Sequence, residues 1–60
     1  MYRLVIKVFL NMNTLAQGKR VLERDITISK ENDLNFQEII RTMHLLYGDK
    51  AVVSFNIFII

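Results

Sequence analysis

Apolar and polar positions alternate along the first ten residues of the chain. Every even position from Tyr2 to Leu10 is apolar, whereas Arg3 and Lys7 occupy odd positions. Successive side chains of a β-strand point to opposite faces, so the alternation separates an apolar face from a partly polar one. Aromatic and β-branched residues, which favour strands, dominate the segment. The pattern predicts a strand over residues 2–10.

The apolar repeat is lost over residues 11–19, which we interpret as the connection to a second strand. Gly18 is the only glycine in this half of the chain. Glycine readily adopts the positive φ that a tight hairpin needs, so a turn is predicted over residues 17–19.

A second, more polar strand is predicted over residues 20–29. Its apolar face carries Leu22, Ile26 and Ile28 together with Arg24, and further charged residues lie on the other face. Charge on an edge strand discourages unwanted pairing. We therefore expect this strand at an edge of the sheet.

Capping signals at both ends indicate one helix. Asn35 is placed as its N-cap, and Glu38 follows three residues later as in a capping box. Leu34 and Ile39 have the spacing of a hydrophobic staple, and Gly48 is placed as a left-handed cap. The stripe predicted to face the sheet is Phe36, Ile39, Ile40, Met43, Leu46 and Tyr47, and the residues expected to face water are Gln37, Glu38, Arg41, Thr42 and His44.

The last ten residues form an almost uninterrupted apolar strand without a charged side chain. One of its faces is wholly apolar, and the other still carries Phe58 and Ile60. A 60-residue domain has one helix with which to cover one face of a sheet. We therefore expect another molecule to cover part of this strand.

These elements predict an α+β fold: a small ββαβ domain over residues 1–60, with one helix packed on one face of a three-stranded antiparallel sheet. A crossover from the second strand would place the third beside the first, in the order 2-1-3. The alternative is a third strand in the middle of the sheet, in the order 1-3-2 or through a swapped connection.

Composition narrows the functional classes. The chain has 52% hydrophobic residues, which argues against disorder, and no cysteine for disulfides or thiolate metal sites. Its net charge of +2 is too small to indicate nucleic acid or anionic lipid by itself. The C-terminal apolar run is about half the length of a membrane-spanning helix, and no signal-peptide pattern is present. We expect a soluble, cytoplasmic protein without a membrane partner.

A binding module without catalytic activity is the favoured interpretation. Self-association through the C-terminal strand and the open sheet face would give a homodimer, because small domains without disulfides often gain burial by oligomerising. Such a module would act on a larger protein as an adaptor or an inhibitor, as accessory proteins of phages and mobile elements often do. The predicted interface comprises Val5, Phe9, Val52, Ser54, Asn56, Phe58 and Ile60.

The alternative is a protein that binds single-stranded nucleic acid through the open sheet face. Aromatic rings between basic groups on a sheet can stack bases and neutralise phosphates. Phe9 and Phe58 would supply the rings, but the recurring RNA-recognition signature is absent. The predicted contacts to nucleic acid are Arg3, Lys7, Lys19 and Arg20.

Enzymatic function has the least support. His44 is the only histidine, and a single histidine on a helix face is usually not catalytic. Glu31, Asp33 and Glu38 lie near the helix start, where carboxylates complement the helix dipole. We expect no catalytic residues, no metal, no cofactor and no small-molecule substrate.

Overall fold

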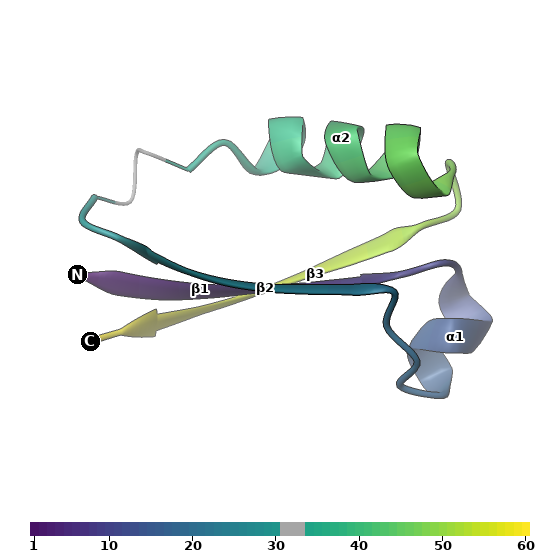
Figure 1. Ribbon diagram of the computed structural model, residues 1–60, viewed down its shortest axis with the longest axis horizontal. Helices are drawn as coiled ribbons and strands as arrows, with labels where there is room; N and C mark the ends of the chain where they lie inside the picture. The colour runs from purple at the N-terminus through teal and green to yellow at the C-terminus, as the bar shows by residue number, and fades with distance from the viewer. Residues whose placement is uncertain (31–33) are drawn as a thin grey trace.

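The computed structural model describes residues 1–30 and 34–60, which form three strands and two helices (Figure 1). The elements in chain order are β1 (Tyr2–Phe9), α1 (Met12–Ala16), β2 (Leu22–Ile28), α2 (Phe36–Tyr47) and β3 (Val52–Ile59). Glu31 and Asp33, considered above as carboxylates near the helix start, lie outside the described residues.

The strands form one antiparallel sheet in the order β2-β1-β3, as predicted. Leu4 of β1 lies opposite Ile26 of β2 and opposite Ile57 of β3. Both outer strands are antiparallel to β1, so they run in the same direction. The chain between them crosses the sheet on one side through α2 (Figure 1).

The core lies between β1 and α2. Leu4, Ile6, Val8 and Ala51 form its buried cluster. No residue of α2 is fully buried, so the helix covers the sheet with side chains that keep part of their surface in water. The partly buried residues packed against the cluster are Leu22, Leu34, Phe36, Ile39, Met43, Tyr47, Val53 and Phe55.

Asn35 and Gly48 flank α2 as predicted, but only the Asn35 half of the predicted capping box is present, and the Gly48 ψ of 165° lies outside the left-handed helical region. The side chain of Asn35 accepts a hydrogen bond of 3.2 Å from the Glu38 N–H. Gly48 follows the last helical residue with a φ of +103°, a conformation that favours glycine. One prediction for the apolar stripe is wrong, because Leu46 is 67% exposed.

Helix α1 was not predicted. The side chain of Asn11 accepts a hydrogen bond from the Thr14 N–H, and the Thr14 hydroxyl accepts one from the Asn11 N–H. This reciprocal capping starts a short helix within the segment expected to be a loop. Gly18 adopts the predicted positive φ, but α1 lies between the two strands, so the prediction of a tight hairpin is wrong.

We predict that Leu4→Ala lowers the free energy of unfolding by about 2–5 kcal/mol, because it leaves a cavity in the middle of the core. Urea denaturation followed by circular dichroism at one fixed protein concentration measures this change. The exposed Leu46→Ala serves as the control and should change stability by less than about 0.5 kcal/mol. Equal losses in both variants would contradict this placement of the core.

Candidate functional site

The outer edge of β3 has unpaired backbone groups that can accept another strand. β3 pairs with β1 along its whole length, and the Ile60 N–H donates to the Met1 carbonyl at 3.1 Å. Hydrogen-bonded pairs alternate along an antiparallel ladder, so this bond sets the phase of the β1–β3 ladder. Even-numbered residues of β3 direct their backbone groups toward β1. The outward-directed groups, here called the β3 edge, belong to Val53, Phe55, Ile57 and Ile59.

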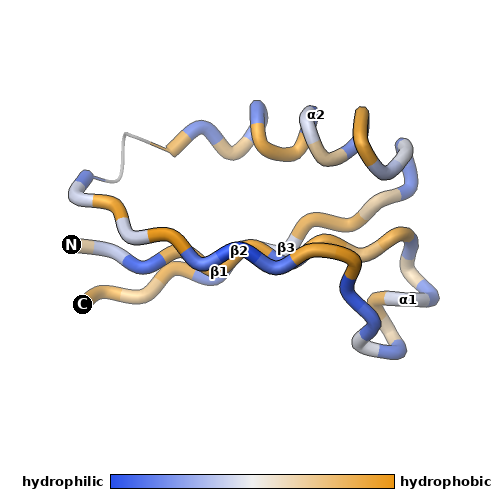
Figure 2. The backbone as a smooth tube through the Cα atoms, viewed as in Figure 1, coloured by the Kyte–Doolittle hydropathy of each residue, from blue (hydrophilic) through white to orange (hydrophobic). Residues whose placement is uncertain are grey.

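The two edges of the sheet differ in charge. Edge strand β2 carries Glu23, Arg24 and Asp25 in succession, whereas no residue of β3 is charged. Figure 2 shows the contrast between a hydrophilic stretch on β2 and a largely hydrophobic β3. Charged residues protect an edge strand from pairing with another chain. The β3 edge lacks this protection.

Exposure increases along β3 toward its C-terminal end. Ala51, just before the strand, is buried, and the Phe55 ring packs against Phe36 of α2 with ring centroids 4.8 Å apart. Beyond this contact Ile57 and Phe58 are about half exposed, and Ile59 is 85% exposed. The part of β3 beyond Phe55 therefore presents apolar side chains to solvent.

The predicted interface residues lie in different environments. Phe9 departs from the expectation of an uncovered position, because it is only 6% exposed. It points to the sheet face opposite α2, where α1 lies against that end of β1 (Figure 1). Sequence reasoning placed no element on that face. Of the other predicted residues, Val5, Val52 and Ser54 are half-buried, and Asn56, Phe58 and Ile60 are exposed.

Charged pairs occupy much of the sheet face opposite α2, here called the open face. The Arg3 guanidinium donates from Nε to both carboxylate oxygens of Asp25, at 3.0 and 2.9 Å, and lies 5.9 Å from the centre of the Phe58 ring. These hydrogen bonds, with the attraction between the charges, lower the pKa of the Asp25 carboxyl and raise the pKa of Arg3. The open face of β1 and β2 is therefore a polar surface with balanced charges.

The predicted cationic contacts do not form one free basic surface. Besides Arg3, Arg20 is paired with Glu23 at 3.2 Å, and both side chains are about half exposed. Lys7 lies opposite Glu23 in the β1–β2 register. Lys19 is exposed in the connection between α1 and β2, whereas Arg3 and Lys7 lie on β1.

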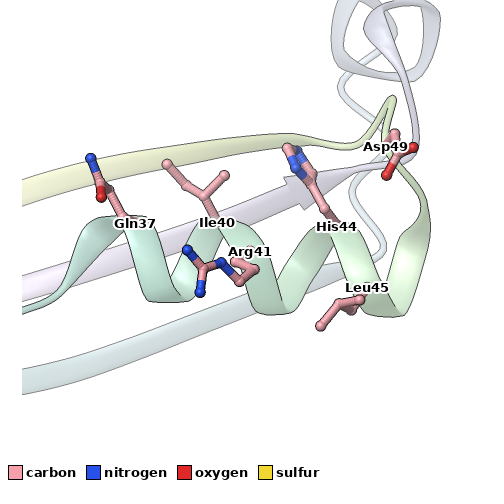
Figure 3. Close-up of a pocket in the computed structure, with 6 residues that line it drawn as sticks. All are labelled: Gln37, Ile40, Arg41, His44, Leu45 and Asp49. Carbon is pink, nitrogen blue, oxygen red and sulfur yellow. The ribbon is translucent and has the colours of Figure 1, made fainter.

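A shallow hollow of about 460 Å³ lies beside α2, lined by Gln37, Ile40, Arg41, His44, Leu45 and Asp49 (Figure 3). Gln37, Ile40 and His44 leave the helix on one side, and Arg41 and Leu45 leave it on another. Leu45 is 82% exposed, so the hollow combines exposed apolar surface with charged and polar side chains.

His44 has a structural contact that the helical pattern did not reveal. Its Nε2 lies 3.0 Å from the Ala51 carbonyl oxygen, and the ring is half-buried instead of facing water. A carbonyl oxygen accepts hydrogen bonds, so Nε2 is the protonated nitrogen in this contact. The bond joins the last turns of α2 to the start of β3. It therefore gives the histidine a role in the fold.

Within residues 1–30 and 34–60, no three histidine, cysteine, aspartate or glutamate side chains gather as a metal site would require. In the same part of the chain, neither helix has the length and hydropathy needed to cross a membrane. No protein-family model, curated protein or solved structure matches the chain.

We predict that His44→Ala lowers the free energy of unfolding by about 1 kcal/mol, because the Ala51 carbonyl loses its hydrogen bond. The neighbouring exposed Leu45→Ala is the control and should change stability by less than about 0.5 kcal/mol. Urea denaturation at one protein concentration compares the two. If His44→Ala is as stable as the control, the hydrogen bond between His44 and Ala51 does not contribute to the stability of the fold.

We predict that Arg3→Gln flattens the acid side of the stability profile. The folded-state pKa of Asp25 lies below its unfolded value, so its contribution is present above the unfolded pKa and is lost as pH falls through the folded pKa. Unfolding free energies measured from about pH 5 downward should fall less steeply in the variant. Arg24→Gln removes the same charge on β2 without touching Asp25 and should keep the wild-type slope. Identical slopes in all three proteins would contradict the assigned pair.

Proposed function

We propose that this chain is a non-enzymatic protein-interaction module that self-associates through the β3 edge. The observation that carries the proposal is the uncharged edge strand, whose outward N–H and C=O groups and exposed apolar side chains lie side by side. An unpaired edge of this kind is a template for strand addition. A second copy presents the same groups, so two copies can satisfy one another around a twofold axis.

In the proposed homodimer, the two β3 strands run antiparallel and join the two three-stranded sheets into one. The twofold axis then stands perpendicular to the sheet, which places both copies of α2 on the same face. Each helix would approach the other with the flank that faces β3, which carries Gln37, Ile40 and His44. This arrangement would extend the apolar layer beneath α2, a helix that has no buried residue of its own in the single chain.

The dimensions of the chain also favour association. Its radius of gyration is 12.0 Å, compared with about 10.4 Å for a typical compact domain of this length. Its surface of 4471 Å² likewise exceeds the roughly 4,100 Å² expected for a folded monomer of this mass. The molecule is flat, with a short axis of 12 Å, and pairing of two edges would reduce the excess surface.

We place the contact at the edge and not across the open face. Charged side chains of β1 and β2 cover much of that face, and the Arg3–Asp25 pair crosses it. Stacking two such faces would remove these charges from water, which costs free energy. The apolar contacts around Phe58 would have to offset that desolvation cost. Strand addition leaves the charges solvated.

Nucleic-acid binding is the weaker alternative. The guanidinium of Arg3 above the Phe58 ring is the one feature that favours it, because stacked aromatic and basic groups bind single strands. However, Glu23 and Asp25 lie on the same face as Arg3 and Lys7 and balance their charge. Phosphate binding depends on a net excess of cations, which this surface lacks.

A larger protein partner would find a separate surface on the proposed dimer. Leu45 and Leu46 are strongly exposed on α2, and the hollow beside Leu45 combines apolar and charged groups. An adaptor or inhibitor needs such a surface in addition to its dimer contact. We propose the outer side of α2 for this role.

We predict that wild-type protein at about 100 µM has twice the 7.1 kDa chain mass by size-exclusion chromatography with light scattering, as micromolar association would produce. Ile57→Lys should shift the protein to the single-chain mass, because a charged side chain would be buried beside the β3 edge. Circular dichroism verifies that the variant retains its fold.

The matched control is Thr27→Lys, which adds the same charge at an exposed position on the β2 edge. This variant should remain dimeric. Ile59→Lys provides a second disruptive variant at a position that is almost fully exposed in the single chain. A wild-type mass of one chain at this concentration would refute the proposed self-association.

A further inference from the structure

The phase of the β1–β3 ladder restricts how a second copy can pair with the β3 edge. Two antiparallel residues exchange hydrogen bonds only where both direct their backbone groups toward each other. On β3 these are the four odd-numbered residues of the β3 edge. A twofold pairing must therefore place odd-numbered residues opposite odd-numbered residues. One residue of β3 then lies directly opposite its own copy across the twofold axis.

Three registers keep most of β3 in contact, centred on Phe55, Asn56 or Ile57. Centring on Asn56 uses the whole β3 edge: Val53 pairs with the partner's Ile59, Phe55 pairs with the partner's Ile57, and the reciprocal pairs complete the ladder. All four outward-directed residues of each copy are then paired with residues of β3.

The other two registers leave part of the β3 edge without a strand partner. Centring on Phe55 places Ile59 opposite the partner's Ala51, which precedes β3 and whose carbonyl already accepts from His44. Centring on Ile57 places Val53 beyond the last residue of the partner's β3. Each keeps three complete pairs within β3, one fewer than the register centred on Asn56.

We propose that a second copy of this chain pairs with β3 in the register centred on Asn56, an inference that rests on the self-association proposed above. Asn56 then faces the partner's Asn56 across the axis, where each amide can donate to the oxygen of the other. On the helix-facing side, the exposed Ile59 lies beside the partner's Val53, and Phe55 lies beside the partner's Ile57. The register thus places apolar side chains beside apolar side chains, and the Asn56 amide beside the amide of the partner's Asn56.

Single cysteines introduced into this cysteine-free chain test the register. Asn56→Cys places two thiols in a non-hydrogen-bonded pair with Cα atoms about 4.5 Å apart, within the range of a disulfide. Ser54→Cys lies on the same face, but its two copies would be offset by roughly 14 Å along the strands. In a glutathione redox buffer, Asn56→Cys should form covalent dimer about tenfold faster or more than Ser54→Cys, measured by non-reducing mass spectrometry.

A mixed experiment provides a second test that leaves Asn56 unchanged. Ser54 lies opposite the partner's Phe58 in this register, so an equal mixture of Ser54→Cys and Phe58→Cys should yield the cross-linked heterodimer. Neither variant alone should cross-link efficiently. This pattern would support the register even if Asn56→Cys weakened the dimer.

The outcomes separate the register from the self-association. Slow cross-linking of both Asn56→Cys and the mixture, with wild type at twice the chain mass, would overturn the register and leave the dimer intact. Rapid cross-linking by Ser54→Cys alone would also overturn it. A monomeric wild type would instead remove the proposed self-association, and the register with it.

Discussion

All strand pairing in the described structure depends on β1. Residues Tyr2–Val8 are paired on both sides, with β2 along one edge and β3 along the other. The same strand supplies Leu4, Ile6 and Val8 to the buried cluster. Because β1 occupies the centre, the sheet needs only one covering helix there. The cost of this arrangement is two exposed edges, each open to another chain.

The two edges solve this problem differently. Strand β2 carries alternating charges, which make addition of an apolar strand unfavourable. Strand β3 has no charge and keeps apolar side chains in water beyond Phe55. Among residues 1–30 and 34–60, only five hydrophobic residues are buried. Such a small core stabilises the chain little, so burial at an edge would be a comparatively large addition to its stability. We therefore interpret the unprotected edge as a contact surface and not as a weak point of the fold.

The sequence predicted the features that depend on local periodicity and caps. The alternation around Leu4 and Ile6 indicated β1, and Asn35 and Gly48 marked both ends of α2. The strand order was also predicted, because a crossover from the second strand places the third beside the first.

The remaining features depend on tertiary contacts. Helix α1 is too short to show an apolar stripe. The polar residues of its reciprocal Asn11–Thr14 cap are also typical of a loop, so the sequence around them did not indicate a helix. Burial of Phe9 and the hydrogen bond between His44 and Ala51 follow from elements that meet only in the fold. An Asn–x–x–Thr sequence before an apolar residue was the one local signal that could have revealed α1.

The intrachain ladder also determines what the β3 edge can bind. A shift of one residue between β1 and β3 would turn the side chains of Val53 and Phe55 away from α2. The Phe36–Phe55 contact opposes that shift, because it holds the Phe55 ring beneath the helix. The residues that fix the register inside the chain are thus the same ones whose backbone groups face outward. Packing between α2 and β3 thereby selects the hydrogen-bonding pattern that a second strand must match.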